Sequence, residues 1–134
     1  MWLIALAIVV AGAVGALTDW LFMGVLFHDA YNRWPEIWRD GVRDGQSRGA
    51  IIASSALGFV SSAAMIALCG FAHVQDLRAA LIVSGLVFLA GPFLVVVVNG
   101  LFVKFDRRIT LSHCLGYLAR IVIAGVAAVL IAHF

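Results

Sequence analysis

The stretch AALIVSGLVFLAGPFLVVVVNGLFV, residues 79–103, decides the fold because it carries no charged side chain from end to end. A helix needs about 20 mainly apolar residues to cross the roughly 30 Å of hydrocarbon in a bilayer. Residues 79–103 exceed that length, so they predict a membrane-spanning helix.

Three other apolar runs resemble this one in length: residues 2–27, 50–72 and 111–133. The whole chain is 64% hydrophobic and 12% charged, with a mean hydropathy of +1.09. Soluble domains are usually about half apolar and a quarter charged. Continuous apolar runs indicate helices, because barrel strands are shorter and alternate in polarity. We therefore predict an all-α integral membrane protein, in which residues 1–134 form a single four-helix transmembrane domain.

The first run is expected to be retained as a helix and not cleaved as a signal peptide. No Lys or Arg precedes it, and its apolar character continues to Phe27. A signal peptide has a basic start and a shorter apolar core.

The basic residues alternate between the connections, which predicts the orientation of the four helices. The first and third connections carry all but one of the basic residues outside the spans: Arg33, Arg39, Arg43, Arg48, Lys104, Arg107 and Arg108. The second connection holds only Arg78. Basic loops stay on the cytoplasmic side. We expect connections one and three to be cytoplasmic and both termini to lie outside.

The first connection contains an aromatic pattern of helical spacing. Tyr31, Trp34 and Trp38 fall at i, i+3 and i+7, Pro35 suits a first helical turn, and Gly41 suits a helix end. Because Trp and Tyr favour the headgroup region, we predict a short amphipathic helix lying in the membrane interface. It serves either as an anchor for the first span or as a docking surface for a partner.

Two ionisable residues lie well inside predicted spans. Asp19 is roughly 12 Å from the cytoplasmic end of the first span, and Arg120 is roughly 13 Å from that of the fourth, at about 1.5 Å per residue. An unpaired charge near the bilayer centre costs about 2.5–3.5 kcal/mol on insertion scales. The matching depths predict an Asp19–Arg120 pair between the two helices.

Further polar residues fall in the same half of the spans. His113, Tyr117 and Arg120 share one helical face, and Asn99 lies about one turn inside Lys104. They suggest a polar cleft open towards the cytoplasm. Two interpretations stay open for Asp19, Asn99, His113, Tyr117 and Arg120. They form either a structural polar cluster, or a binding site in which Arg120, His113 and Lys104 receive an anionic group such as a lipid phosphate while Asp19 orients Arg120.

No catalytic motif, cofactor motif or metal-ligand spacing is present in the sequence. His28, Asp29 and His113 are expected near the same interface, but their spacing does not enforce a metal site. The net charge is only +2 and the basic residues are not clustered, which argues against nucleic acid as a partner. Cys69 and Cys114 are expected near opposite faces, too far apart for a disulfide.

The segment Met23-Gly-Val-Leu-Phe-His-Asp-Ala-Tyr31, followed by Trp34 and Trp38, resembles a bacterial family of small four-helix membrane proteins of unknown function. Ser112-His113 and Gly116-Tyr117 are similar to the closing helix of that family. The resemblance implies four helices in a bacterial inner membrane and implies no activity.

These observations predict a non-enzymatic membrane protein that is either an accessory subunit of a membrane complex or a lipid-binding protein. Expected partners are membrane lipid, a second copy of the chain or another membrane protein. The alternative is a small transporter that moves an anionic or amphipathic solute through the cytoplasmic-facing cleft.

Overall fold

The computed structural model describes residues 1–33, 48–104 and 106–133. All regular structure in these ranges is helical, and four helices there are long and apolar enough to cross a membrane: Trp2–Leu26, Arg48–Phe71, Leu77–Phe102 and Arg107–Ala132. The predicted helical class and the four apolar helices are thus confirmed. Trp34 and Trp38 lie outside the described residues, so the interfacial helix stays a prediction there.

Several of the long helices change their winding along their length. The first consists of α1 (Trp2–Asp19) and the π-helical segment η1 (Trp20–Leu26), and a short helix α2 (His28–Asn32) follows it. The second is α3 (Arg48–Phe71). The third consists of α4 (Leu77–Phe88), the π-helical η3 (Leu89–Phe93) and α5 (Leu94–Phe102). The fourth consists of α6 (Arg107–Ala127) and the π-helical η4 (Ala128–Ala132).

Aspartate caps explain why two helices begin earlier than predicted. The Asp76 carboxylate accepts a hydrogen bond from the Ala79 backbone N–H at 2.8 Å, and the Asp106 carboxylate accepts one from the Arg108 backbone N–H at 2.9 Å. These caps satisfy backbone donors of the first turn, so that turn can contain polar residues. Hydropathy alone placed the starts at residues 79 and 111 because it does not detect such a turn.

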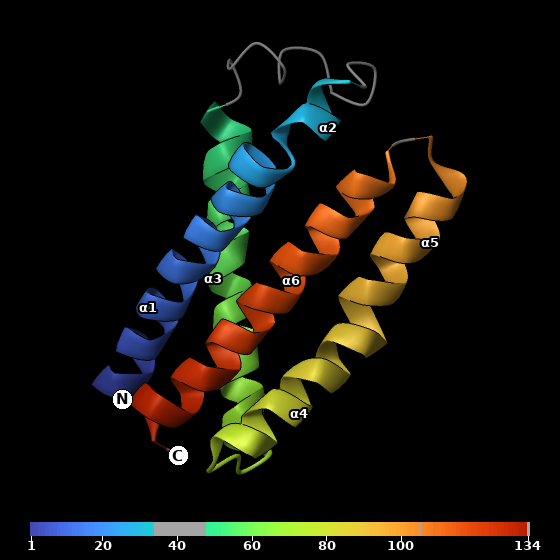
Figure 1. The fold of residues 1–134 in the computed structure, drawn as a ribbon. Helices are drawn as coiled ribbons and strands as arrows, with labels where there is room; N and C mark the ends of the chain where they lie inside the picture. The colour runs from blue at the N-terminus through green and yellow to red at the C-terminus, as the bar shows by residue number, and fades with distance from the viewer. Residues whose placement is uncertain (34–47, 105, 134) are drawn as a thin grey trace.

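Helix α6 lies at the centre of the bundle and packs against α1, α3, α4 and α5 (Figure 1). Both chain termini lie at the end of the bundle where α3 connects to α4, which we call the terminal end. Helix α2 and the α5–α6 connection lie at the opposite end. We call this the basic end, because the described helix ends and connections there carry Arg33, Arg48, Lys104, Arg107 and Arg108.

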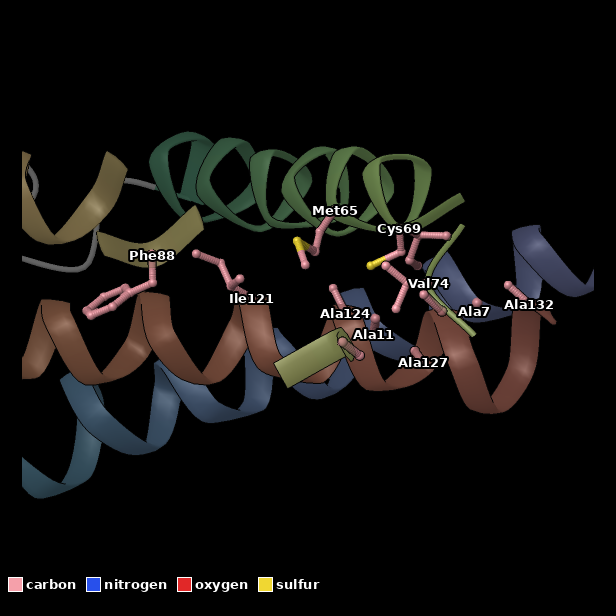
Figure 2. Close-up of a cluster of buried hydrophobic side chains, with 13 residues drawn as sticks. Ala7, Ala11, Met65, Cys69, Val74, Phe88, Ile121, Ala124, Ala127 and Ala132 are labelled. Carbon is pink, nitrogen blue, oxygen red and sulfur yellow. The ribbon is translucent and has the colours of Figure 1, made fainter. Parts of the chain in front are cut away.

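The terminal half of the bundle is closed by a hydrophobic cluster that is rich in alanine. Side chains from α1, α3, α4 and the fourth helix meet there (Figure 2). The cluster includes Ala7, Ala11, Met65, Ile66, Cys69, Val74, Ala80, Ile121, Ala124, Ala127 and Ala128. Small side chains let helix backbones approach closely without a large apolar residue between them. The packing therefore holds four helices together at this end.

The basic half is packed more loosely. Helix α5 contains no buried residue, and in the described part of the chain its main contacts are with η3 and α6. A smaller apolar cluster, formed by Ala30, Tyr31 and Ile109 with Met23 and Phe27, joins α2 to the start of α6. The clefts between the helices in this half are lined in part by polar side chains, among them Asp19, Tyr117 and Arg120.

Candidate functional site

Asp19, the last residue of α1, forms an ion pair with Arg120 of α6. The guanidinium Nη2 of Arg120 contacts the carboxylate Oδ2 of Asp19. The pair predicted from equal depths is therefore present. Its side chains are not sealed, since Arg120 is 12% and Asp19 21% exposed.

Three glycines on three helices make room for this ion pair. A Cβ atom on Gly58 of α3 would lie 3.0 Å from Cζ of Arg120, and one on Gly116 of α6 would lie 3.1 Å from Oδ1 of Asp19. A Cβ atom on Gly15 of α1 would lie 3.3 Å from Cγ of Arg120. Contacts this short displace a side chain or the helix that carries it. The glycines thus allow α1, α3 and α6 to close around the pair.

The pair lines a cleft of about 670 Å³ between the first helix, α3 and α6. We call it the ion-pair cleft. Its polar lining consists of Asp19, His28, Tyr31, Ser54, Ser55, Ser61, Tyr117 and Arg120, and its larger apolar residues are Trp20, Met23, Ile51 and Leu57. Sites for small molecules usually have volumes of about 300–1,000 Å³, apolar walls and a few polar groups. The ion-pair cleft fits that description.

A second cleft, of about 750 Å³, lies between η3, α5 and α6. It is lined by Pro92, Val95, Val96, Asn99, Val103, His113 and Tyr117. Because three of these residues are valines, we call it the valine cleft. No Asp, Glu, Lys or Arg appears among these lining residues. The two clefts therefore differ in charge.

The predicted site residues divide between the two clefts. Asp19 and Arg120 line the ion-pair cleft, Asn99 and His113 line the valine cleft, and Tyr117 lines both. Because Tyr117 lines both clefts, it stands where they adjoin. Lys104, which was expected beside Arg120, lines neither cleft. A single polar cleft was predicted, whereas in the described part of the chain these side chains line two clefts that share one residue.

Tyr31 was expected to anchor a helix at the membrane interface, but its side chain is directed into the bundle. It is only 7% exposed, and its hydroxyl donates a hydrogen bond to Oγ of Ser112 at 3.3 Å. Its ring centroid lies 6.0 Å from that of His113. Burial raises the pKa of Tyr31, while the hydrogen bond to Ser112 acts in the opposite direction. Tyr31 therefore connects α2 to α6.

Sequence reasoning did not identify Trp20, Met23 or Ser61 as lining residues. Trp20 and Met23 belong to η1, and its π-helical winding rotates side chains away from the positions that a regular helix would give them. The hydropathy pattern contains no signal of this change. Gly15, Gly58 and Ser61 are small residues of the predicted spans, but the sequence does not say which side chain they accommodate.

The ion pair retains the capacity to bind an anion. A guanidinium has more N–H donors than one carboxylate can accept, and a phosphate or carboxylate can receive those that are left over. Within the described residues, no group of three or more His, Cys, Asp or Glu side chains is arranged to hold a metal ion. Cys69 and Cys114 are free thiols.

Comparison of the chain with protein-family models, curated proteins and solved structures gives no match. The resemblance to small four-helix membrane proteins stays a prediction.

Proposed function

We propose that the chain is an integral membrane protein that binds an anionic lipid, with the lipid's charged group in the ion-pair cleft. The observation that carries this proposal is the partial exposure of the Asp19–Arg120 pair to a cleft with apolar walls. A pair whose only role is to join two helices needs no opening to a cleft, whereas the Arg120 guanidinium can be reached from this one. Access to the guanidinium is what a lipid headgroup requires.

Placement in a membrane is the first part of the proposal. Large apolar side chains are exposed along all four long helices, among them Val9, Ile52, Leu86, Val95 and Leu130. Water would make such a surface very unfavourable, whereas acyl chains would solvate it. The charge asymmetry favours a cytoplasmic basic end, so that both termini lie outside a bacterial inner membrane.

Cysteine labelling tests this orientation. The two native thiols are replaced by alanine, and a single cysteine is introduced as Asp76→Cys at the terminal end or Lys104→Cys at the basic end. A membrane-impermeant maleimide should label the first variant in intact spheroplasts and the second only after lysis. The opposite pattern would refute the orientation, and equal labelling of both variants in intact spheroplasts would refute membrane insertion.

The chemistry of the cleft favours an anionic amphipathic ligand. Arg120 offers fixed N–H donors, and hydroxyls of Ser54, Ser55 and Tyr117 lie along the same walls. The nearby apolar residues suit the glycerol backbone and the first part of an acyl chain. Asp19 holds the guanidinium in one orientation, which reduces the rotamer entropy lost on binding. These residues bind and orient a lipid, and the proposal includes no catalytic step.

Native mass spectrometry of the protein, extracted from its own membrane in mild detergent, tests lipid binding. Wild-type protein should retain a phospholipid with a net negative charge. Arg120→Gln should lose it, while Arg78→Gln, the same change at the terminal end, should keep it. If the Arg120→Gln variant stays helical and retains the lipid as well as wild-type protein does, the lipid does not bind in the ion-pair cleft.

Because Arg120→Gln leaves Asp19 without its partner, a second variant is needed. The Asp19→Asn/Arg120→Gln double variant carries no isolated charge and should fold with less loss. It should also lose the lipid. If the double variant keeps it, Arg120 has no role in lipid binding, whatever the stability of the single variant.

A transporter is the second candidate, and one observation favours it. The two clefts lie in the basic half, whereas the terminal half is closed by the alanine-rich cluster. A carrier that is open to one side has this shape. Flux of an anionic or amphipathic solute into proteoliposomes that stops with Asp19→Asn would favour transport. Extraction with a tightly held protein, and no lipid, would instead favour an accessory subunit of a membrane complex.

A further inference from the structure

The valine cleft contains polar side chains that the bundle itself does not use. Asn99, His113 and Tyr117 line it, and the side chain of none of the three forms a hydrogen bond to another described residue. His113 contacts Tyr117 only through their rings, whose centroids are 6.2 Å apart. Polar groups that face an apolar medium without a partner cost free energy. Three of them around one cleft indicate a ligand that supplies the missing partners.

The lining residues restrict the chemistry of that ligand. No formally charged side chain is among the described lining residues, so these residues offer no counter-ion to a phosphate or an ammonium group. The Asn99 amide, the Tyr117 hydroxyl and the His113 imidazole can each donate a hydrogen bond. Such a set suits an uncharged head with carbonyl acceptors.

The arrangement of the donors favours a flat head with acceptors on two edges. Asn99 comes from α5, whereas His113 and Tyr117 come from α6, so donors lie on both walls of the cleft. The tilted rings of His113 and Tyr117 offer aromatic surface to a planar ligand. Val95, Val96 and Val103 complete walls against which an apolar tail can lie.

We propose that the valine cleft binds the head of a membrane quinone, a planar ring with carbonyl oxygens on opposite edges and an apolar tail. One carbonyl accepts from Asn99, and the other accepts from Tyr117 or His113. The tail leaves the cleft along the valines towards the lipid. This inference rests on the proposed membrane placement but not on the anionic lipid, because Arg120 does not line the valine cleft.

The loose packing of α5 makes entry to the cleft feasible. Pro92 lies within η3 at the edge of the cleft, and neighbouring Gly91 has no atom within 4 Å of an added Cβ. Proline removes a backbone hydrogen bond, so helices bend at such positions. Because α5 beyond this point packs mainly on α6, a small bend at Pro92 changes the width of the cleft.

Binding is tested with decylubiquinone, a short-tailed quinone, and the full-length protein in nanodiscs of pure phosphatidylcholine. Native mass spectrometry should detect one quinone for each chain, and the thermal midpoint should rise with quinone concentration. Asn99→Leu and Tyr117→Phe should each weaken binding about tenfold, the factor expected for one lost hydrogen bond to the ligand. Gln75→Leu removes an amide outside both clefts and should bind as wild type does.

Several results would overturn the proposal. One is that no quinone binds, and another is that Asn99→Leu and Tyr117→Phe leave quinone binding unchanged. The third is that a diacylglycerol, which has ester carbonyls but no ring, competes for the cleft as well as the quinone does. The anionic-lipid proposal is judged separately. Asn99→Leu should weaken quinone binding and keep the phospholipid, whereas Arg120→Gln should lose the phospholipid and bind quinone as wild type does, so either proposal can fail alone.

Discussion

The Asp19–Arg120 pair gives the most direct prediction of stability. Asp19→Asn leaves the Arg120 guanidinium between α1, α3 and α6 without its counter-ion, and Arg120→Gln leaves the Asp19 carboxylate alone. Removing one partner of a fully buried pair costs about 3–5 kcal/mol. Because Arg120 is 12% and Asp19 21% exposed, solvent or headgroups can partly compensate, and we expect about 2–3 kcal/mol for each single variant.

The double variant separates a pair from two independent polar residues. An amide at each position removes both charges, and the two amides can form a hydrogen bond with each other. We therefore expect the double variant to be about 1–2 kcal/mol more stable than the sum of the single losses predicts. The free energy of unfolding is measured by circular dichroism in mixed micelles with an increasing fraction of sodium dodecyl sulfate.

A control variant and a clear contrary result complete this test. Arg78→Gln changes a basic residue at the terminal end, away from the pair, and should shift stability by about 0.5 kcal/mol or less. Losses in the single variants that add within about 0.5 kcal/mol would refute the energetic coupling of Asp19 and Arg120.

Two other predictions follow from the packing. Gly58→Ala places a Cβ atom 3.0 Å from the Arg120 guanidinium, whereas Gly85→Ala meets no atom within 4 Å. The Gly58→Ala variant should therefore be less stable than the Gly85→Ala variant by about 1–3 kcal/mol in the same unfolding assay. Equal stability would mean that α3 does not approach the pair this closely. Burial raises the pKa of Tyr31 above its ordinary value of 10.0, so the folded state holds the phenolic proton more tightly than the unfolded state. The stability that this residue contributes is full below pH 10.0 and is lost as pH rises through the folded pKa. Tyr31→Phe should remove that loss. If the free energy of unfolding of this variant still falls in the same way at alkaline pH, the ionising group lies elsewhere.

Hydropathy and charge spacing were sufficient to predict the four apolar helices and the partner of Asp19. Long uncharged runs have few alternatives to a helix, and two opposite charges at equal depth each need a partner. The predictions erred where local polar contacts decide the structure. Asp76 and Asp106 extend two helices through caps, and hydropathy does not register them.

The separation of the polar residues into two clefts could not be predicted from helical faces. Spacing places His113, Tyr117 and Arg120 on one side of α6, but neighbouring helices decide which cleft each residue enters. Helix α3 lies on one side of Tyr117 and α5 on the other, and this depends on how closely glycines and alanines allow the helices to approach. The same limit applies to Tyr31, whose burial depends on a hydroxyl partner that lies 81 positions away in the sequence.

Photo-crosslinking tests the central claim, that an anionic lipid binds in the ion-pair cleft. The protein is reconstituted with a phosphatidylglycerol that carries a diazirine next to the headgroup, and the labelled peptides are identified by mass spectrometry. We expect label on residues 51–61 of α3 and 117–120 of α6, with loss of that label in Arg120→Gln. Label spread over the outer faces of α4 and α5, with none on these two segments, would contradict the claim.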